Sequence, residues 1–78
     1  MIISDHAHEE MQNSGITEDE VRQCLDHGDL EITQFIKCEK RYGKKLNLKN
    51  KTIMVIYTFV RNEERVITAY TIRRKKIW

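Results

Sequence analysis

The hydrophobic pattern of the chain changes its period once, at Gly28, and this change restricts the fold more than any other feature. Before it, Val21, Cys24 and Leu25 follow the i, i+3, i+4 spacing of an amphipathic helix. After it, the apolar residues are largely β-branched or aromatic and tend to alternate with polar ones, as in half-buried strands. The sequence therefore predicts helices in the first third of the chain and strands in the remainder.

Two N-terminal helices are predicted from the residues at their ends. The first covers residues 5–13 and stops at Gly15, which can adopt the left-handed conformation that closes a helix. The second covers residues 18–27. Thr17, just before this helix, and Glu20, in its first turn, have the spacing of a capping box. In a capping box each of the two side chains accepts a hydrogen bond from the backbone N–H of the other residue.

Four strands are predicted in the second half of the chain, over residues 30–37, 40–48, 52–60 and 65–73, and residues 1–3 are a candidate for a short edge strand. Two helices followed by antiparallel strands predict an α+β fold, with the two N-terminal helices packed on one face of a four-stranded antiparallel sheet. Because the chain has no proline and no linker rich in glycine or serine, residues 1–78 are predicted to form a single domain.

The face of the sheet that the helices cover depends on the turn at residues 61–64. If this turn pairs Val60 with Arg65, one face carries polar and aromatic residues, namely Tyr57, Thr68 and Tyr70. The other face is aliphatic and carries Met54, Ile56, Ile67 and Ala69. We assign the aliphatic face to the helices and expect the aromatic face to be open. A slip of one residue in the register would invert this assignment.

The charges are separated along the chain. Residues 1–36 contain nine carboxylates and one cation, a net charge of −8, whereas residues 37–78 contain thirteen cations and three carboxylates, a net charge of +10. A half-chain this basic suits a polyanion such as RNA. The alternative is that acidic helices and basic strands neutralise each other within the fold.

Aromatic rings and cations on an open sheet face are typical of surfaces that bind single-stranded nucleic acid, because bases stack on the rings and cations hold the phosphates. The residues predicted for this role are Tyr42, Lys44, Lys45, Tyr57 and Arg73. Two alternatives remain open. The tyrosines can complete a second small core, and the cations of residues 73–76 can protect a strand edge from pairing.

His6, at the predicted start of the first helix, is the best candidate for a general base. In RNA cleavage without a metal, a base removes the 2′-hydroxyl proton while cations stabilise the phosphorane-like transition state. Cations for this purpose are available on the strands, Arg41 among them. His6 and His8 cannot share a metal ion, since residues two apart on a helix point to nearly opposite sides, and we predict neither a metal nor a cofactor. The alternative role of His6 is that of a surface histidine near a helix cap.

The two cysteines, Cys24 and Cys38, lack a CxxC spacing and are interpreted as reduced thiols, with a single disulfide between them as the alternative. The N-terminus lacks the basic and apolar regions of a signal peptide, and no apolar run approaches the roughly 18 residues of a membrane span. The sequence therefore predicts a cytoplasmic protein without membrane contacts.

Three short motifs resemble a family of small bacterial and phage-associated domains of unknown function. These are His6-Ala7, Gly15-Ile16-Thr17 with the acidic helix start that follows, and the strand at residues 66–70 with its Thr-x-Tyr ending. The resemblance covers nearly the whole chain, although each motif is short. That family is in turn similar to the RelE-like ribonuclease toxins, in which two N-terminal helices pack against an antiparallel sheet whose other face meets RNA.

Carried over to this chain, the resemblance implies that His6, Arg41, Thr68 and Tyr70 are catalytic residues. One position departs from the family pattern, because Ser14 stands where an arginine usually precedes the Gly-Ile step. If that arginine contacts phosphate in the relatives, this chain is inactive or binds its ligand differently.

Two classes of function follow. The first is a metal-independent endoribonuclease toxin or a degenerate RNA-binding relative of one, with RNA and an antitoxin protein as partners. The second is a non-catalytic interaction module, or a homodimer in which the acidic helices of one copy meet the basic strands of another. A neighbouring gene for a small DNA-binding antitoxin would favour the first class.

Overall fold

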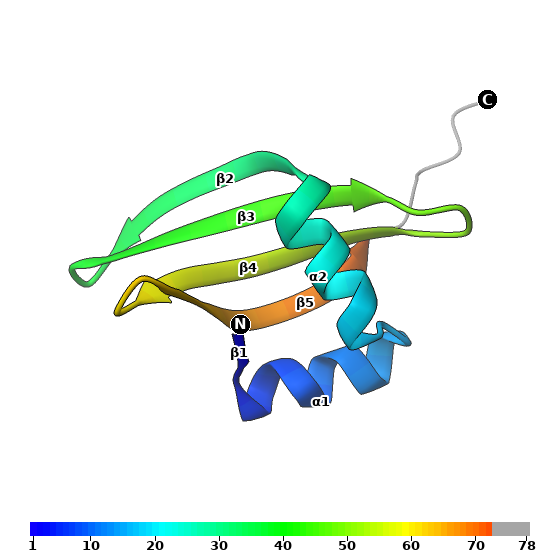
Figure 1. Cartoon of the computed structure of the whole chain (residues 1–78), viewed down its shortest axis with the longest axis horizontal. Coiled ribbons are helices and arrows are strands. Elements are labelled where there is room, and N and C mark those ends of the chain that lie inside the picture. Colours follow the sequence, from blue (N-terminus) through cyan, green and yellow to red (C-terminus); the bar gives the residue numbers. More distant parts are fainter. Residues whose placement is uncertain (73–78) are drawn as a thin grey trace.

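The computed structural model describes residues 1–72 and shows an α+β fold of two helices and a five-stranded sheet (Figure 1). The elements are β1 (Ile2–Ile3), α1 (Asp5–Ser14), α2 (Glu18–His27), β2 (Asp29–Ile36), β3 (Glu39–Asn47), β4 (Thr52–Val60) and β5 (Glu63–Ile72). The predicted α+β class is confirmed. The sheet is mixed, however, because its order is β1-β5-β4-β3-β2 and β1 runs parallel to β5. Arg73, which we expected at the end of the last strand, lies outside the described residues.

Both helices begin at their predicted caps. At the start of α1, the backbone N–H of Ala7 donates a hydrogen bond to Ser4 Oγ at 3.1 Å. At the start of α2, Thr17 and Glu20 form the predicted capping box, with reciprocal hydrogen bonds of 2.8 and 3.2 Å. The first helix ends at Gly15, whose φ of 66° is a left-handed conformation that glycine adopts at little cost. Local sequence signals therefore determine these helix ends.

At the end of α2, Gly28 is not required for its backbone conformation, because any residue can adopt its φ of −70°. A Cβ atom at this position would lie 2.4 Å from the carbonyl oxygen of Cys24 and 3.0 Å from that of Lys45. The missing side chain therefore lets the chain pass from α2 into β2 in close contact with β3. On the same strand, the ammonium group of Lys44 donates a hydrogen bond to the carbonyl oxygen of Leu25, in the last turn of α2.

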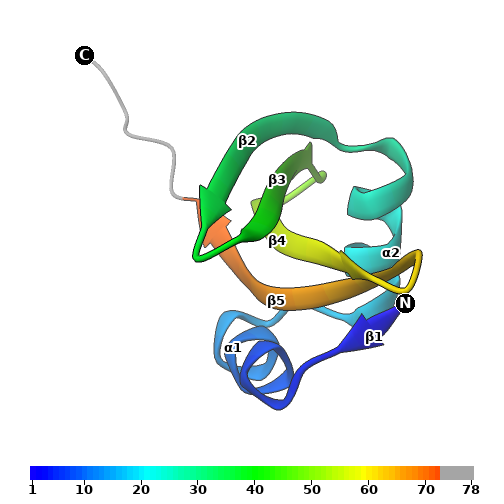
Figure 2. The ribbon, with the colours of Figure 1, turned by 90° about the vertical axis from the view of Figure 1, so that its left-hand side faces the viewer.

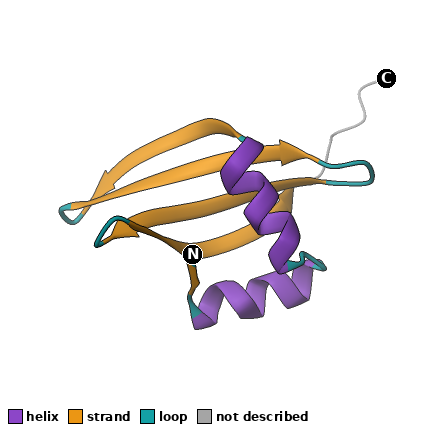
Figure 3. Cartoon of the chain, in the orientation of Figure 1, coloured by secondary structure: helices purple, strands orange, loops and turns teal. Residues whose placement is uncertain are grey.

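Two tight hairpins lie at one end of the sheet, opposite the loop between β3 and β4 (Figure 3). The turn between β2 and β3 has φ values of 48° at Lys37 and 63° at Cys38. The turn between β4 and β5 has φ values of 52° at Arg61 and 66° at Asn62. Positive φ at both central residues is the signature of a two-residue type I′ turn. The turn that we predicted over residues 61–64 therefore contains only two residues.

This shorter turn shows that the predicted register was wrong. Val60 pairs with Glu63 and not with Arg65. The register shifts again between Ile56 and Tyr57, where a β-bulge interrupts the ladder. The sequence offered no signal for this bulge, and a shift by one residue exchanges the faces of a strand.

The corrected register changes the residues of β4 that face the helices. Val55 and Tyr57 lie beneath them, at 0% and 4% exposure, whereas Ile56 is half-buried on the other face. Our assignment was therefore wrong for β4. It is confirmed in β5 for Ala69, which is fully buried, and for Tyr70, which is 38% exposed, but not for Ile67, which is half-buried at the bulge and outside the core.

The second helix crosses the sheet over β3 and β4, and α1 runs beside β5 (Figures 1 and 2). We call the face under α2 the helix face. Its core consists of Ala7, Met11, Ile16, Val21, Cys24, Leu25, Ile53, Val55, Tyr57, Val66 and Ala69. We call the opposite face the open face. By strand alternation it carries Ile32, Arg41, Lys45, Met54, Ile56, Thr58, Arg65, Thr68 and Tyr70.

Candidate functional site

The open face has a small apolar centre that separates two polar ends. Ile32 and Ile56 approach each other over Gly43, where an added Cβ would lie 2.9 Å from Ile56 Cδ1 and 3.0 Å from Ile32 Cβ. Glycine at this position therefore lets the two isoleucines meet. The polar end nearer the hairpin turns contains Arg41 and Arg65, and it is the end where the structure is hollowed.

A pocket of about 420 Å³ lies at this end, between the start of α1 and three neighbouring strands. Its lining residues are Ser4, His6, Glu39, Arg41, Thr58, Arg65 and Ile67. Thr58 and Arg65 are paired across β4 and β5. On the neighbouring strand, Arg41 precedes Tyr42, which pairs with Tyr57 next to Thr58. The pocket therefore combines an imidazole, two guanidinium groups, a carboxylate and two hydroxyls.

The two arginines of the pocket differ in their partners. Arg41 Nε donates a hydrogen bond to Glu39 Oε1 at 3.0 Å, so part of its charge is balanced. Arg65 makes no ion pair with any of residues 1–72. The His6 side chain is 65% exposed, and its Nε2 lies 4.0 Å from Glu10 Oε1 on the next turn of α1. Both His6 and Arg65 are therefore accessible to a ligand in the pocket.

Two of the four predicted catalytic residues, His6 and Arg41, line this pocket, and two do not. Thr68 pairs with Ile56 and Tyr70 pairs with Met54, farther along the open face. At about 3.3 Å per residue, they lie roughly 10 and 16 Å along β5 from Arg65. The roles of all four residues stay predictions.

Sequence reasoning missed Arg65, Glu39 and Thr58. They become neighbours of His6 only through the register of three strands and the position of α1. Had the turn been recognised as two residues long, counting along the two strands would have placed Arg65 opposite Thr58. No signal in the sequence shows that α1 brings His6 to the same place.

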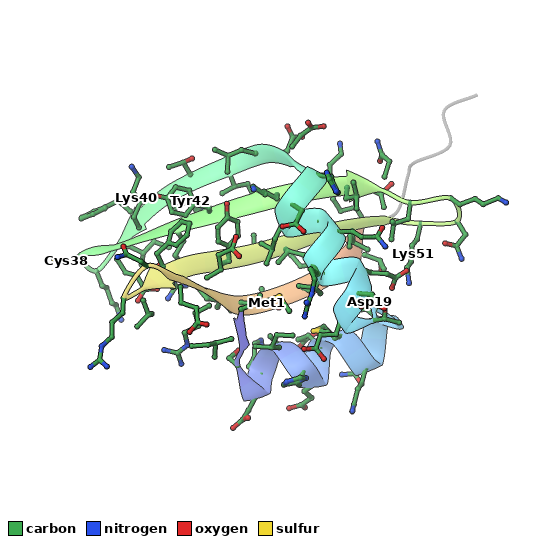
Figure 4. All side chains as sticks on the ribbon, viewed as in Figure 1. Met1, Asp19, Cys38, Lys40, Tyr42 and Lys51 are labelled. Carbon is green, nitrogen blue, oxygen red and sulfur yellow. The ribbon has the colours of Figure 1, made fainter. Side chains whose placement is uncertain are left out.

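The predicted aromatic platform lies on the helix face. Tyr42 stacks on Tyr57 with ring centroids 5.5 Å apart, and Phe59 contacts both rings edge-on at 5.7 and 5.8 Å. Tyr57 is 4% exposed, so its ring is closed to a stacking base. Burial, followed by the negative charge of Glu64, raises its pKa. Lys40 lies 5.7 Å from the centroid of the half-buried Tyr42 ring, and the two side chains are neighbours on β3 (Figure 4).

The predicted binding lysines separate onto the two faces. Lys44 lies on the helix face, bonded to the Leu25 carbonyl and 5.7 Å from the centroid of the Tyr57 ring. Lys45 lies on the open face, with its Nζ 3.7 Å from Glu31 Oε1. Lys44 is thus occupied within the fold, whereas Lys45 is available to a ligand.

Direct ion pairs do little to balance the charge separation along the chain. Within residues 1–72, two pairs join a carboxylate of the first 36 residues to a later cation, Glu31 with Lys45 and Glu20 with Lys51. The Lys51 pair, at 2.9 Å, fastens the loop between β3 and β4 to the start of α2, and the same Nζ donates to the carbonyl oxygen of Gly15 at 2.6 Å. The other carboxylates of residues 1–36 make no ion pair with a strand cation of the described chain.

Both cysteines are free thiols, one in the core and one at the tip of a hairpin. Burial raises the pKa of Cys24 to about 11, and its Sγ donates to the carbonyl oxygen of Lys44 at 3.2 Å. Cys38 is exposed at the turn between β2 and β3, far from α2 (Figure 4). In the described part of the chain, His, Cys, Asp and Glu residues form no group of three that could hold a metal ion.

Neither helix of the described chain has the length and apolar character needed to cross a membrane.

The comparison with protein families identifies the chain. The family model described as "Domain of unknown function (DUF4258)" matches residues 3–71, which is nearly the whole of the described structure. The chain therefore belongs to this family. The comparisons with curated proteins and with solved structures found no match.

Proposed function

We propose that this DUF4258 domain binds single-stranded RNA on its open face and cleaves it without a metal ion. One observation carries the proposal: the pocket joins the imidazole of His6 to the guanidinium groups of Arg41 and Arg65. An accessible imidazole can act as a base, and guanidinium groups bind phosphate through several N–H donors at once. The combination suits the cleavage of a phosphodiester that carries a neighbouring hydroxyl.

In the proposed reaction, His6 takes the proton of the ribose 2′-hydroxyl. The 2′-oxygen then forms a bond to phosphorus while the bond from phosphorus to the 5′-oxygen breaks, and the leaving oxygen takes a proton from water. The products are a 2′,3′-cyclic phosphate and a 5′-hydroxyl. Arg41 and Arg65 stabilise the additional negative charge of the transition state, and Lys45 and Tyr70 extend the binding surface along the open face.

The similarity to RelE-like toxins that the sequence motifs imply for this family supports the proposal. In those toxins the helices pack on one side of the sheet and RNA meets the other side. The open face of this chain is likewise opposite α2. On this proposal the domain is a toxin in the cytoplasm, and an antitoxin protein would block the open face.

A second candidate is an RNA-binding domain that does not cleave. The hydrogen bond from Arg41 to Glu39 favours it, because one of the two arginines that would bind phosphate is already paired with a carboxylate. Ser14, at the position of an expected arginine, points in the same direction. The two candidates share a binding surface and differ in the chemical step.

The test uses a fluorescent single-stranded RNA in buffer with EDTA. We expect wild-type protein to release a fragment ending in a 2′,3′-cyclic phosphate, and His6→Ala to slow cleavage by about 10²- to 10⁴-fold. His8→Ala is the matched control, since His8 is exposed on the same helix but does not line the pocket. RNA with a single 2′-deoxyribose at the cleavage position should bind and stay intact.

Binding is followed in the same samples as a function of salt. Each phosphate contact contributes roughly −0.7 to the slope of log affinity against log salt for a single strand, so Arg65→Gln should flatten the slope by about one contact. Lys49→Gln removes an exposed loop cation and should change it less. RNA that binds but is never cleaved supports the second candidate. Equal behaviour of His6→Ala and His8→Ala contradicts the catalytic role of His6, and binding that ignores salt contradicts both candidates.

A further inference from the structure

The two edges of the sheet are protected to different degrees. One edge is the two-residue β1, beside which α1 packs along β5. The other is β2, eight residues long, in which every residue except the half-buried Ile32 is exposed. Leu30, Phe35 and Ile36 are 55%, 72% and 39% exposed. Edge strands are commonly protected by charges, a proline, a bulge or a covering element; in β2 the charges and the bulge lie at its start, at Asp29, Glu31 and the Leu30–Ile32 step, and within residues 1–72 the segment Ile32–Ile36 has neither a charge nor a proline.

The backbone of β2 offers free hydrogen-bonding groups at defined positions. A two-residue hairpin turn is closed by a hydrogen-bonded pair, here Ile36 with Glu39, and such pairs alternate along an antiparallel ladder. The N–H and C=O groups of Thr33 and Phe35 therefore point away from β3. The ladder is regular from Ile32 to Ile36 and shifts only between Leu30 and Ile32. Five residues are thus ready to pair with another strand.

We propose that β2 pairs with β2 of a second copy of this chain, antiparallel and centred on Gln34. Thr33 then lies opposite Phe35 of the second copy, so the outward groups of both residues meet and form hydrogen bonds. Ile32 lies opposite Ile36 of the second copy on the open face, which joins two apolar side chains. The twofold axis passes through Gln34, and every contact occurs twice.

Charge complementarity supports the same register. Glu31 and Lys37 flank the regular segment Ile32–Ile36, so centring on Gln34 brings Glu31 of one copy near Lys37 of the other. Lys37 makes no ion pair within the described chain, whereas Glu31 also lies 3.7 Å from Lys45 of its own chain. A shift by two residues in either direction places Gln34 against Ile32 or Ile36 and separates the isoleucine pair. The register centred on Gln34 is the one that satisfies hydrogen bonding, apolar pairing and charge together.

The proposed dimer contains one continuous ten-stranded sheet, because each copy contributes five strands. Its two open faces lie on the same side, so the pockets of both copies face one partner. The dimer does not depend on the ribonuclease proposal, since β2 contributes no residue to the pocket.

A cross-linking experiment on the full chain tests the register. In a Cys38→Ser background, Gln34→Cys places two thiols across a pair that is not hydrogen-bonded, where Cα atoms are about 4.5 Å apart and a disulfide can form. Ile36→Cys in the same background is the control, because its two copies lie about 13 Å apart along the strands. We expect mild oxidation to produce a covalent dimer from the first variant within minutes and at least tenfold less from the second. Equal cross-linking of the two variants overturns the register.

The association itself is measured by sedimentation of the unmodified chain. We expect the mass to rise from that of a 9.4 kDa monomer to twice this value with increasing concentration. Thr33→Pro removes an outward N–H and should keep the chain monomeric, and Phe35→Lys should do the same by adding a charge to an exposed position. Both variants should melt within a few degrees of the dilute wild type. A wild-type chain that stays monomeric up to millimolar concentration overturns the proposal. So does a result in which both variants dimerise as strongly as the wild type.

Discussion

Lys44 and Lys45 are neighbours on β3, yet they face opposite sides of the sheet and have different partners. On the helix face, Lys44 donates a hydrogen bond to the last turn of α2 and lies over the Tyr57 ring. On the open face, Lys45 lies 3.7 Å from one exposed carboxylate. The comparison shows that the face of the sheet decides whether a cation is part of the fold or available to a ligand.

Apolar residues on the two faces differ in the same way. The helix face buries Ile53 and Val55 completely. On the open face Met54 is buried at 6% exposure, but Ile56 is only half-buried, and Ile36 and Val60 are 39% and 40% exposed. Stability should therefore reside on the helix face and binding on the open face. Two predictions test this division and a third tests the ion pair that links the β3–β4 loop to α2, from the largest expected effect to the smallest.

The largest effect should come from removing core volume on the helix face. Ile53→Ala is expected to lower the free energy of unfolding by about 2–5 kcal/mol, because the residue is fully buried and leaves a cavity. Ile36→Ala is the matched control on the other face and should cost less than about 1 kcal/mol. Urea denaturation followed by circular dichroism measures both values. Equal costs would show that the two faces do not differ in this way.

A smaller effect should separate the two lysines. Lys44→Met is expected to cost about 1–3 kcal/mol, since it removes the donor to the Leu25 carbonyl at the end of α2. Lys45→Met removes an exposed ion pair and should cost less than about 1 kcal/mol. RNA binding should show the reverse order, with the greater loss for Lys45→Met. The same order in both measurements would contradict the division of roles.

The smallest effect concerns Glu20 and depends on pH. Partial burial acts to raise the pKa of Glu20, but hydrogen bonds from Thr17 and Lys51 and the charge of Lys51 outweigh it, so the pKa lies below its usual value of 4.5. A carboxyl with a lowered pKa stabilises the fold above pH 4.5, and this contribution is lost as the pH falls through the folded value. Glu20→Gln keeps the capping box and removes the charge. Its unfolding free energy should be lower than that of the wild type by less than about 1 kcal/mol at pH 7 and should converge with it in acid.

Lys51→Met is the control for this effect, because it removes the cation and leaves the carboxylate in place. The variant should show a weaker acid dependence than the wild type in the same range. A difference between wild type and Glu20→Gln that is equally large at pH 7 and pH 3 would contradict the argument. Thermal melting across this range is sufficient to measure it.

The helices could be predicted from the sequence because their signals are local. Thr17, Glu20 and Gly15 act on groups within a few residues of themselves, and the structure shows the expected hydrogen bonds and the positive φ. The strand positions were also anticipated to within a few residues. Alternation along one strand depends on that strand alone.

The register between strands could not be predicted in the same way. Arg61 and Asn62 form a two-residue turn without the glycine that usually indicates one, and nothing marks the bulge beside Ile56. The shorter turn moves the pairing by two residues and keeps the faces, whereas the bulge moves it by one and exchanges them, so Tyr57 shares its face with Val66 and Ala69 and lies in the core. The candidate site was affected too: His6 and Arg41 were proposed in advance, whereas Arg65 was found only through its pairing.

The sequence by itself determined the order of the elements, the helix caps and the separation of acidic from basic residues, because each depends on neighbours along the chain. The tertiary structure alone decided which face of β4 is buried, which lysine of β3 is free and that His6 lies in a pocket with two arginines. These features depend on contacts between residues far apart in the chain: one residue of register exchanges the faces of a strand, and the packing of α1 against β5 sets the position of His6.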